Sequence, residues 1–235
     1  MSEATPYLSL VVAARNDDHG GNLLGRIQTF VNAFVGQAKR HRLAAELVFV
    51  EWNPPLGREP LMQALRWPED LGSCQVRIIE VPAELHRRYR HAEALPLYQM
   101  IAKNVGIRRA RGQFILATNI DILFSDELMR FLTGGNLQKG RMYRIDRHDV
   151  MCDVPVDGSV EEQLAYCQSR LLRVHARGAT LILTPQEQRE TPALPPSDRP
   201  PAAEAAPPEE MWAGEVAIRF GAGWSEPQRF FGQTS

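Results

Sequence analysis

The sequence predicts an α/β fold built around a mostly parallel sheet. Short apolar runs alternate along the chain with longer segments in which apolar residues recur every three or four positions. The short runs are typical of strands that are buried on both faces, and the longer spacing is that of one helical face. Because strand, helix and strand follow one another, we expect the strands to pair in parallel.

Four apolar runs in the first half of the chain are expected to form this sheet: 8–14 (LSLVVAA), 46–50 (ELVFV), 76–81 (VRIIEV) and 113–117 (QFILA). Their valine, isoleucine and leucine content suits strands that are covered on both sides. The second run stops before Pro54, and the third stops at Pro82, because proline cannot donate a hydrogen bond to a neighbouring strand and restricts the residue before it.

Helices are expected between these strands. Asn22 is a suitable N-cap for a helix over 23–41, whose apolar residues lie on one face. A second helix begins near Pro96, which a first helical turn tolerates, and Gly112 is a suitable C-cap for it. Ser125 is expected to cap a third helix, whose acidic first turn is favourable against the helix dipole and which ends at a Gly-Gly pair.

The second half of the chain has weaker signals. Residues 141–146 (RMYRID) and 179–183 (ATLIL) predict two more strands, and the S-x-x-E pattern that begins at Ser159 is a capping box that predicts a helix. Residues 185–210 are rich in proline and have almost no large apolar side chains, so a flexible or polyproline linker is expected there. The predicted organisation is a main domain over 1–184, this linker, and a short C-terminal segment over 211–235.

Composition excludes several classes of function. The formal charge is −1, with 27 basic and 28 acidic residues, so we expect no nucleic-acid partner. The three cysteines are an odd number without a C-x-x-C pair, which argues against a disulfide framework and a zinc ribbon and favours the reducing cytoplasm. No apolar run approaches the ~20 residues of a membrane span, and no signal peptide is recognisable. Peripheral contact with a membrane is left open.

Polar residues follow three of the predicted strands: Arg15, Asn16 and Asp17 after the first, Glu51 and Asn53 after the second, and Asn119 and Asp121 after the fourth. Because the carboxyl ends of parallel strands lie at one edge of a sheet, we expect these residues to form the ligand site. A dinucleotide or P-loop site would need a G-x-G-x-x-G or G-x-x-x-x-G-K-[ST] pattern, and neither occurs.

The ordered set of elements resembles the nucleotide-binding half of a GT-A fold glycosyltransferase of the family-2-like group. Many members begin with a strand that ends in Pro-x-Tyr-Asn, and here residues 13–16 (AARN) match at Asn16 alone. Glu51 matches the acidic residue after the second strand. Residues 102–106 (AKNVG) match the family's A-x-N-x-G, and 119–121 (NID) match its D-x-D motif. The resemblance covers roughly residues 7–150 and implies a Rossmann-like GT-A sandwich.

The resemblance also implies roles for the strand-end residues. Asp121 is expected to ligate a divalent cation, Mn²⁺ or Mg²⁺, that bridges the diphosphate of a nucleotide-diphosphate sugar. Asn119 is expected near the ribose or beside the metal, and Glu51 is expected to accept a hydrogen bond from the base. Asn119 replaces the first carboxylate of the motif, which removes one negative charge and should weaken the metal site. The other substrate-binding candidates are Arg15, Asn16, Asp17, Asn53 and Lys103.

An inverting sugar transfer needs a carboxylate that takes the proton of the acceptor hydroxyl. Candidates for this base are found in the segment YRIDRHDVMCDVPVDG: Asp146, Asp149, Asp153 and Asp157. Nothing in their spacing singles out one of them, and we take Asp149 and Asp146 as the catalytic candidates.

The predicted function is transfer of a sugar from a nucleotide-diphosphate donor to a glycan or lipid-linked acceptor, in surface polysaccharide synthesis. A non-catalytic nucleotide-sugar-binding or scaffolding module is the alternative, and an unrelated nucleotide-binding regulator is a third hypothesis. An Asn-x-Asp sequence also occurs as a plain turn or capping device. The basic run 86–91 (HRRYRH) is interpreted as a solvated loop.

Overall fold

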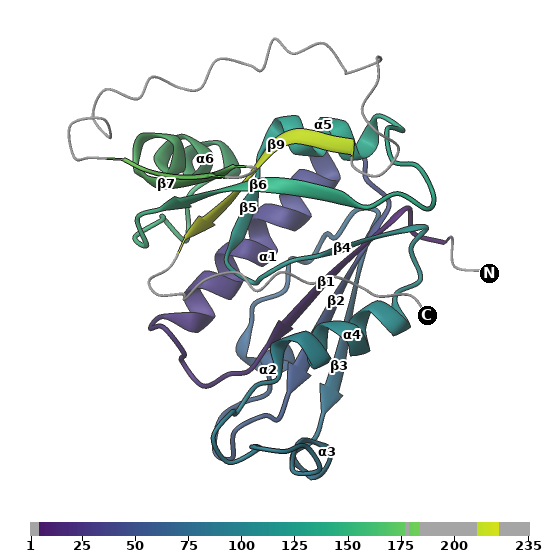
Figure 1. The fold of residues 1–235 in the computed structure, drawn as a ribbon, viewed down its shortest axis with the longest axis vertical. Coiled ribbons are helices and arrows are strands. Elements are labelled where there is room, and N and C mark those ends of the chain that lie inside the picture. Colours follow the sequence, from purple (N-terminus) through teal and green to yellow (C-terminus); the bar gives the residue numbers. More distant parts are fainter. Residues whose placement is uncertain (1–4, 177–178, 184–210, 221–235) are drawn as a thin grey trace.

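The computed structural model of the chain describes residues 5–176 and 179–183, and the backbone of 211–220. The predicted α/β architecture is confirmed: helices flank a four-stranded sheet that is parallel throughout, in the order β3-β2-β1-β4 (Figure 1). Its strands are β1 (Leu8–Ala14), β2 (Ala45–Trp52), β3 (Cys74–Val81) and β4 (Phe114–Ala117). This is a Rossmann-like arrangement.

Different helices cover the two faces of this sheet (Figure 1). The helix α1 (Leu23–Arg40) packs on one face, where Leu10 and Val12 join the main core. The helix α4 (Gln99–Arg109) packs on the other face, where Ala13 belongs to a second cluster that includes Ala102 of α4. Because successive side chains of a strand point to opposite faces, a strand covered on both sides must be apolar throughout.

A second sheet of five strands has the order β5-β9-β6-β7-β8. Its strands are β5 (Ile122–Phe124), β6 (Tyr143–Val150), β7 (Leu171–Ala176), β8 (Ala179–Ile182) and β9 (Met211–Phe220). Only β6 and β9 pair in parallel, and the other pairs are antiparallel. The sequence did not predict β5, which is three residues long, or β7, which is separated from the preceding helix by one residue.

The remaining helices are α2 (Leu61–Ala64), α3 (Ala83–His86), α5 (Asp126–Thr133) and α6 (Val160–Ser169). The predicted capping of α5 is confirmed, since the Ser125 side chain accepts a hydrogen bond from the backbone N–H of Leu128. The predicted capping box of α6 is also present, with reciprocal bonds between Ser159 and Glu162. These caps depend on residues three positions apart, so the local sequence was sufficient to predict them.

Two predicted helix caps were wrong. Asn22 lies in the left-handed region (φ 47°) and its side chain caps nothing, while Asp18 Oδ1 accepts the N–H of Leu23 at 3.0 Å. The helix α4 ends at Arg109, and Gly112 instead packs against β1, where an added Cβ would lie 2.6 Å from the backbone nitrogen of Ser9. The first is decided by a hydrogen bond to a residue five positions earlier in the same loop, and the second by packing between separate segments.

Residues 211–220, which were expected in a separate C-terminal segment, form β9 within the second sheet. The predicted linker over 185–210 lies outside the described residues. The predicted domain boundaries therefore stay predictions. Within the part of the chain that the structure describes, no helix has the length and apolar character that a membrane crossing requires.

Candidate functional site

A cavity of about 250 Å³ lies at the carboxyl ends of β1 and β4. The chain leaves β1 through α1 to reach β2 on one side of it, whereas β4 pairs on the other side. The order of the strands therefore reverses between β1 and β4, and such switch points are where open α/β sheets bind ligands. Four predicted site residues line this cavity: Arg15, Asp17, Asn119 and Asp121.

The loop after β1 supplies a pair of opposite charges to the cavity. Arg15 NH1 lies 2.8 Å from Asp17 Oδ2, and Arg15 Nε donates to the carbonyl oxygen of Asn53 at 2.6 Å. Asp17 Oδ1 accepts the backbone N–H of His19 at 3.2 Å. Both side chains are thus held in place by the loop and by the end of β2.

Asn53 lies behind the cavity and joins three segments. Its backbone N–H donates to Val81 at the end of β3, and its Nδ2 donates to the Pro96 carbonyl at 3.0 Å. Its own carbonyl oxygen accepts the hydrogen bond from Arg15 Nε. A left-handed backbone (φ 49°) allows these three directions, and asparagine tolerates that conformation better than most residues. Asn53 therefore positions the cavity wall, and it is not among the lining residues.

The helix α4 holds Asn119. Its Oδ1 accepts hydrogen bonds from Lys103 Nζ at 2.7 Å and from Gln99 Nε2 at 3.0 Å. Lys103 and Gln99 lie one helical turn apart, so both reach the same oxygen. The structure thereby brings together two residues that the sequence predicted separately, and places a cation directly beside the residue that replaces the first carboxylate of the motif.

Asp121 is buried and faces Arg26, a residue that the sequence reasoning missed. Arg26 NH1 lies 3.5 Å from Asp121 Oδ2. Arg26 also donates from Nε to the Gly21 carbonyl at 3.1 Å and from NH2 to the His19 carbonyl. It belongs to the first turn of α1, directly after the loop that follows β1. A basic residue at that position was the signal that could have identified it.

Glu51 and Asn16 do not line the cavity. Glu51 is buried, and both of its carboxylate oxygens lie 3.0 Å from the backbone nitrogen of Leu61. Burial raises the pKa of Glu51, the Leu61 N–H lowers it, and the charge of Glu80 raises it further. Asn16 Nδ2 donates to the Glu59 carbonyl at 2.9 Å. Glu51 and Asn16 thus hold the start of α2 and the residue two positions before it against the sheet, and their expected contacts with the donor stay predictions.

The two catalytic candidates belong to β6 of the second sheet. Asp149 Oδ2 lies 2.9 Å from His175 Nε2, and its Oδ1 lies 2.9 Å from Arg147 Nε. Neither Asp146 nor Asp149 lines the cavity. The strand register nevertheless relates Asp149 to the motif, because Asp149 pairs with a residue of β9 that in turn pairs with Ile122, next to Asp121. Two strand spacings correspond to about 10 Å between backbones.

Buried aromatic residues support the wall of the cavity at 95–97. Trp52 Nε1–H donates to His86 Nδ1 at 2.8 Å, so the other ring nitrogen carries the proton and donates to the Ala92 carbonyl at 2.9 Å. The Tyr98 ring packs against both Trp52 and His86. The basic run 86–91 is therefore only partly the solvated loop that was predicted, since His86 is buried and the residues after it are exposed.

The oxygens of the motif do not fit a divalent cation as they are arranged. Mg²⁺ and related ions take about six oxygen ligands, including carboxylates. Here the Asp121 carboxylate faces Arg26, and the Asn119 oxygen accepts from Lys103. Among the described residues, no group of three histidine, cysteine, aspartate or glutamate side chains could hold a metal. The predicted Mn²⁺ or Mg²⁺ therefore remains an expectation from the resemblance.

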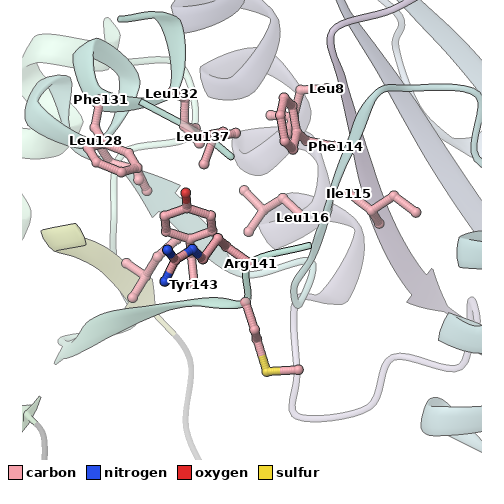
Figure 2. A pocket seen from close by; sticks show the side chains of 12 residues that line it. Leu8, Phe114, Ile115, Leu116, Leu128, Phe131, Leu132, Leu137, Arg141 and Tyr143 are labelled. Carbon is pink, nitrogen blue, oxygen red and sulfur yellow. The ribbon is translucent and has the colours of Figure 1, made fainter. Parts of the chain in front are cut away.

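A second cavity, of about 260 Å³, lies at the opposite end of the sheet. Leu8 and Phe114, the first residues of β1 and β4, contribute to its lining. Figure 2 shows leucine and phenylalanine side chains of α5 on one side of it and side chains of β4 on the other. Its polar lining is confined to Arg141 and Tyr143, so it lacks the convergent polar groups of the first cavity.

No protein-family model matches the sequence, and no curated protein shows a significant match to it. The cavity at the ends of β1 and β4 is therefore interpreted from its own residues.

Proposed function

We propose that the protein is a glycosyltransferase that binds a nucleotide-diphosphate sugar in the cavity at the ends of β1 and β4. The sugar would be transferred to a glycan or lipid-linked acceptor in surface polysaccharide synthesis. The observation that carries this proposal is the meeting of Arg15, Asp17, Asn119 and Asp121 in one cavity at the switch point of a Rossmann-like sheet. The resemblance of residues 7–150 to the GT-A family-2-like group supports it.

The polar lining suits a donor of this class. Guanidinium groups bind phosphate oxygens through two parallel N–H donors, and Arg15 and Arg26 both line the cavity. The carboxylates of Asp17 and Asp121 can accept hydrogen bonds from sugar hydroxyls. A cavity of about 250 Å³ is slightly smaller than the roughly 300–1,000 Å³ usual for small-molecule sites, so it accommodates part of a donor with the rest on its open side.

The proposed reaction is a displacement at the anomeric carbon of the donor sugar. The acceptor hydroxyl oxygen forms the new bond to this carbon, the bond to the diphosphate oxygen breaks, and the nucleoside diphosphate leaves with that electron pair. A carboxylate takes the proton of the attacking hydroxyl. Asp149 and Asp146 keep this role in the proposal, and the register places the Asp149 backbone two strand spacings, about 10 Å, from that of Ile122.

Binding of a nucleoside diphosphate tests the site. Isothermal titration calorimetry with UDP and GDP, each with EDTA and with MnCl₂, should detect binding of at least one of them to the wild-type protein. Leu95→Glu places a negative charge at the cavity and should weaken binding at least tenfold. Leu85→Glu is the matched control, because both leucines are about half exposed, at 42% and 49%, and Leu85 is not a lining residue. Failure of the wild type to bind either nucleotide in both buffers would reject the proposal.

A non-catalytic nucleotide-sugar-binding or scaffolding module is the second candidate. It is favoured by one observation: Asp149 is engaged by His175 and Arg147, and neither it nor Asp146 lines the cavity. Release of nucleoside diphosphate from UDP-sugars and GDP-sugars distinguishes the two. The transferase predicts slow donor hydrolysis that Asp149→Asn reduces while donor binding is retained, and the binding module predicts no turnover.

The proposal includes a cytoplasmic location, with peripheral membrane contact where the acceptor is lipid-linked. All three cysteines lie in described segments and are free, which supports a reducing compartment. Burial raises the pKa of the Cys74 and Cys167 thiols to about 12, so neither is a nucleophile at neutral pH.

A further inference from the structure

Each acidic or amide side chain that the motif and the β1 loop present to the cavity already faces a side-chain cation through one of its oxygens. Asp17 faces Arg15 at 2.8 Å, Asp121 faces Arg26 at 3.5 Å, and the Asn119 oxygen accepts from Lys103 at 2.7 Å. A divalent ion bound to these oxygens would lie beside positive charges, which repel it. The same positive charges attract a diphosphate.

Arg26 is built into the protein as a fixed cation. Its side chain is only 11% exposed, and its Nε and NH2 groups donate to the carbonyls of Gly21 and His19 in the loop after β1. These bonds hold the plane of the guanidinium at the cavity, so a bound anion would cost little further ordering of this side chain. Arg26 also lies in the first turn of α1, which contains no acidic residue and carries the positive end of the helix dipole.

The contact between Arg26 and Asp121 leaves donor capacity for a ligand. An ammonium or guanidinium group that bonds fully to a carboxylate lies about 2.7–2.9 Å from it. The distance here is 3.5 Å, at the outer limit of a hydrogen bond. Arg26 NH1 can therefore donate to a phosphate oxygen in the cavity while Asp121 continues to balance its charge.

Formal charges point the same way. Arg15, Arg26 and Lys103 contribute three positive charges, and Asp17 and Asp121 contribute two negative charges, which leaves a net charge of +1. In a site that relies on a bound metal, the carboxylates are there to hold the cation. Here they hold arginines.

We infer that Arg26, assisted by Lys103 beside Asn119, neutralises the diphosphate of the donor in place of a divalent cation. This inference rests on the proposed function, because it concerns the same cavity and the same donor. It predicts metal-independent binding, and it assigns to Asp121 the orientation of Arg26 instead of metal ligation. It also accounts for an asparagine at position 119, since a second carboxylate strengthens a metal site but is not needed to hold an arginine.

Calorimetry with UDP and GDP on wild-type protein, Arg26→Gln and Arg26→Lys tests the inference. For the nucleotide that binds, the wild-type affinity should be the same within twofold in EDTA and in MnCl₂. Arg26→Gln should weaken binding at least tenfold in EDTA, and Arg26→Lys, which keeps the charge but loses the fork of donors, should weaken it less. Arg87→Gln is the control, because Arg87 is 65% exposed and lies outside the cavity lining.

The outcomes separate the inference from the proposed function. Wild-type binding that requires Mn²⁺ would overturn the inference and leave the donor site intact, as would unchanged affinity in Arg26→Gln. Absence of binding in both buffers would instead reject the donor site. Thermal unfolding of each variant establishes that it is folded. If Arg26→Gln does not fold, Arg26→Lys tests the inference alone. The inference is overturned if this variant binds the nucleotide as tightly as the wild type in EDTA and tenfold more tightly when Mn²⁺ is added.

Discussion

Gly106 lets α4 lie directly on the central strands, and its replacement by alanine tests how closely that helix must pack. A Cβ at this position would lie 2.5 Å from Val11 Cγ1 and 3.0 Å from Val50 Cγ2. Both valines are fully buried, on β1 and β2, so they have little room to move. The same helix carries Lys103 and Gln99, which hold Asn119 at the cavity.

The expected magnitude follows from two opposing effects. Alanine is favoured over glycine in a helix by about 1 kcal/mol. Overpacking a close-packed interior costs roughly 1–3 kcal/mol. Because the contact at 2.5 Å involves a buried side chain of a central strand, we place the cost at the upper end, and expect Gly106→Ala to lower the free energy of unfolding by about 1–2 kcal/mol.

Urea unfolding monitored by circular dichroism measures this change, provided that the slope with denaturant is the same in both proteins. Gly36→Ala in α1 is the matched control, since its Cβ would meet only Val160 Cγ2, at 3.4 Å. That variant should be as stable as the wild type or more stable by up to about 1 kcal/mol. A Gly106→Ala protein as stable as Gly36→Ala would refute the reasoning.

Three further predictions concern buried polar groups. Glu51→Gln keeps an acceptor for the Leu61 N–H but removes a charge that burial disfavours, so it should raise the free energy of unfolding at pH 7. Because the pKa of Glu51 is raised in the fold, this advantage should vanish below pH 4.5. A loss of stability at pH 7 would contradict this reasoning. Burial raises the pKa of Glu46, but hydrogen bonds from three neighbouring groups lower it below its ordinary value. The wild type should therefore have a higher free energy of unfolding than Glu46→Gln. In urea titrations this difference should be full above pH 4.5 and should shrink as the pH falls below that value. His86→Phe leaves the buried Trp52 N–H without its acceptor and should cost about 1–3 kcal/mol in the same assay, whereas an unchanged midpoint would show that the bond is dispensable.

Local patterns were sufficient for much of the fold. The run at 8–14 was predicted with the bounds that β1 has, and the caps at Ser125 and Ser159 were predicted correctly. Each of these depends on residues close together in sequence: a continuous apolar run, typical of a strand that is buried on both faces, or a side chain that bonds three residues ahead. The parallel pairing followed from the order of strand and helix alone.

Prediction failed where distant segments decide the structure. The strand β5 has only three residues, and it is a strand because β9, almost a hundred residues later, pairs with it. The Glu51 carboxylate accepts the N–H of Leu61, ten residues later, a contact that the sequence did not predict, while its expected contact with the donor stays a prediction. The type of a residue near the end of a strand does not indicate which backbone group its side chain will meet, because that depends on how separate segments pack.

The candidate site divides in the same way. The sequence by itself determined that Arg15, Asp17, Asn119 and Asp121 would meet at one edge of the sheet, because the carboxyl ends of parallel strands must lie together. Only the tertiary structure decided which charges these residues face. Arg26 reaches Asp121 from a helix ninety-five positions earlier in the chain, and Lys103 reaches Asn119 from α4. Side-chain electrostatics depends on distances of a few ångströms between such segments, which no local pattern encodes.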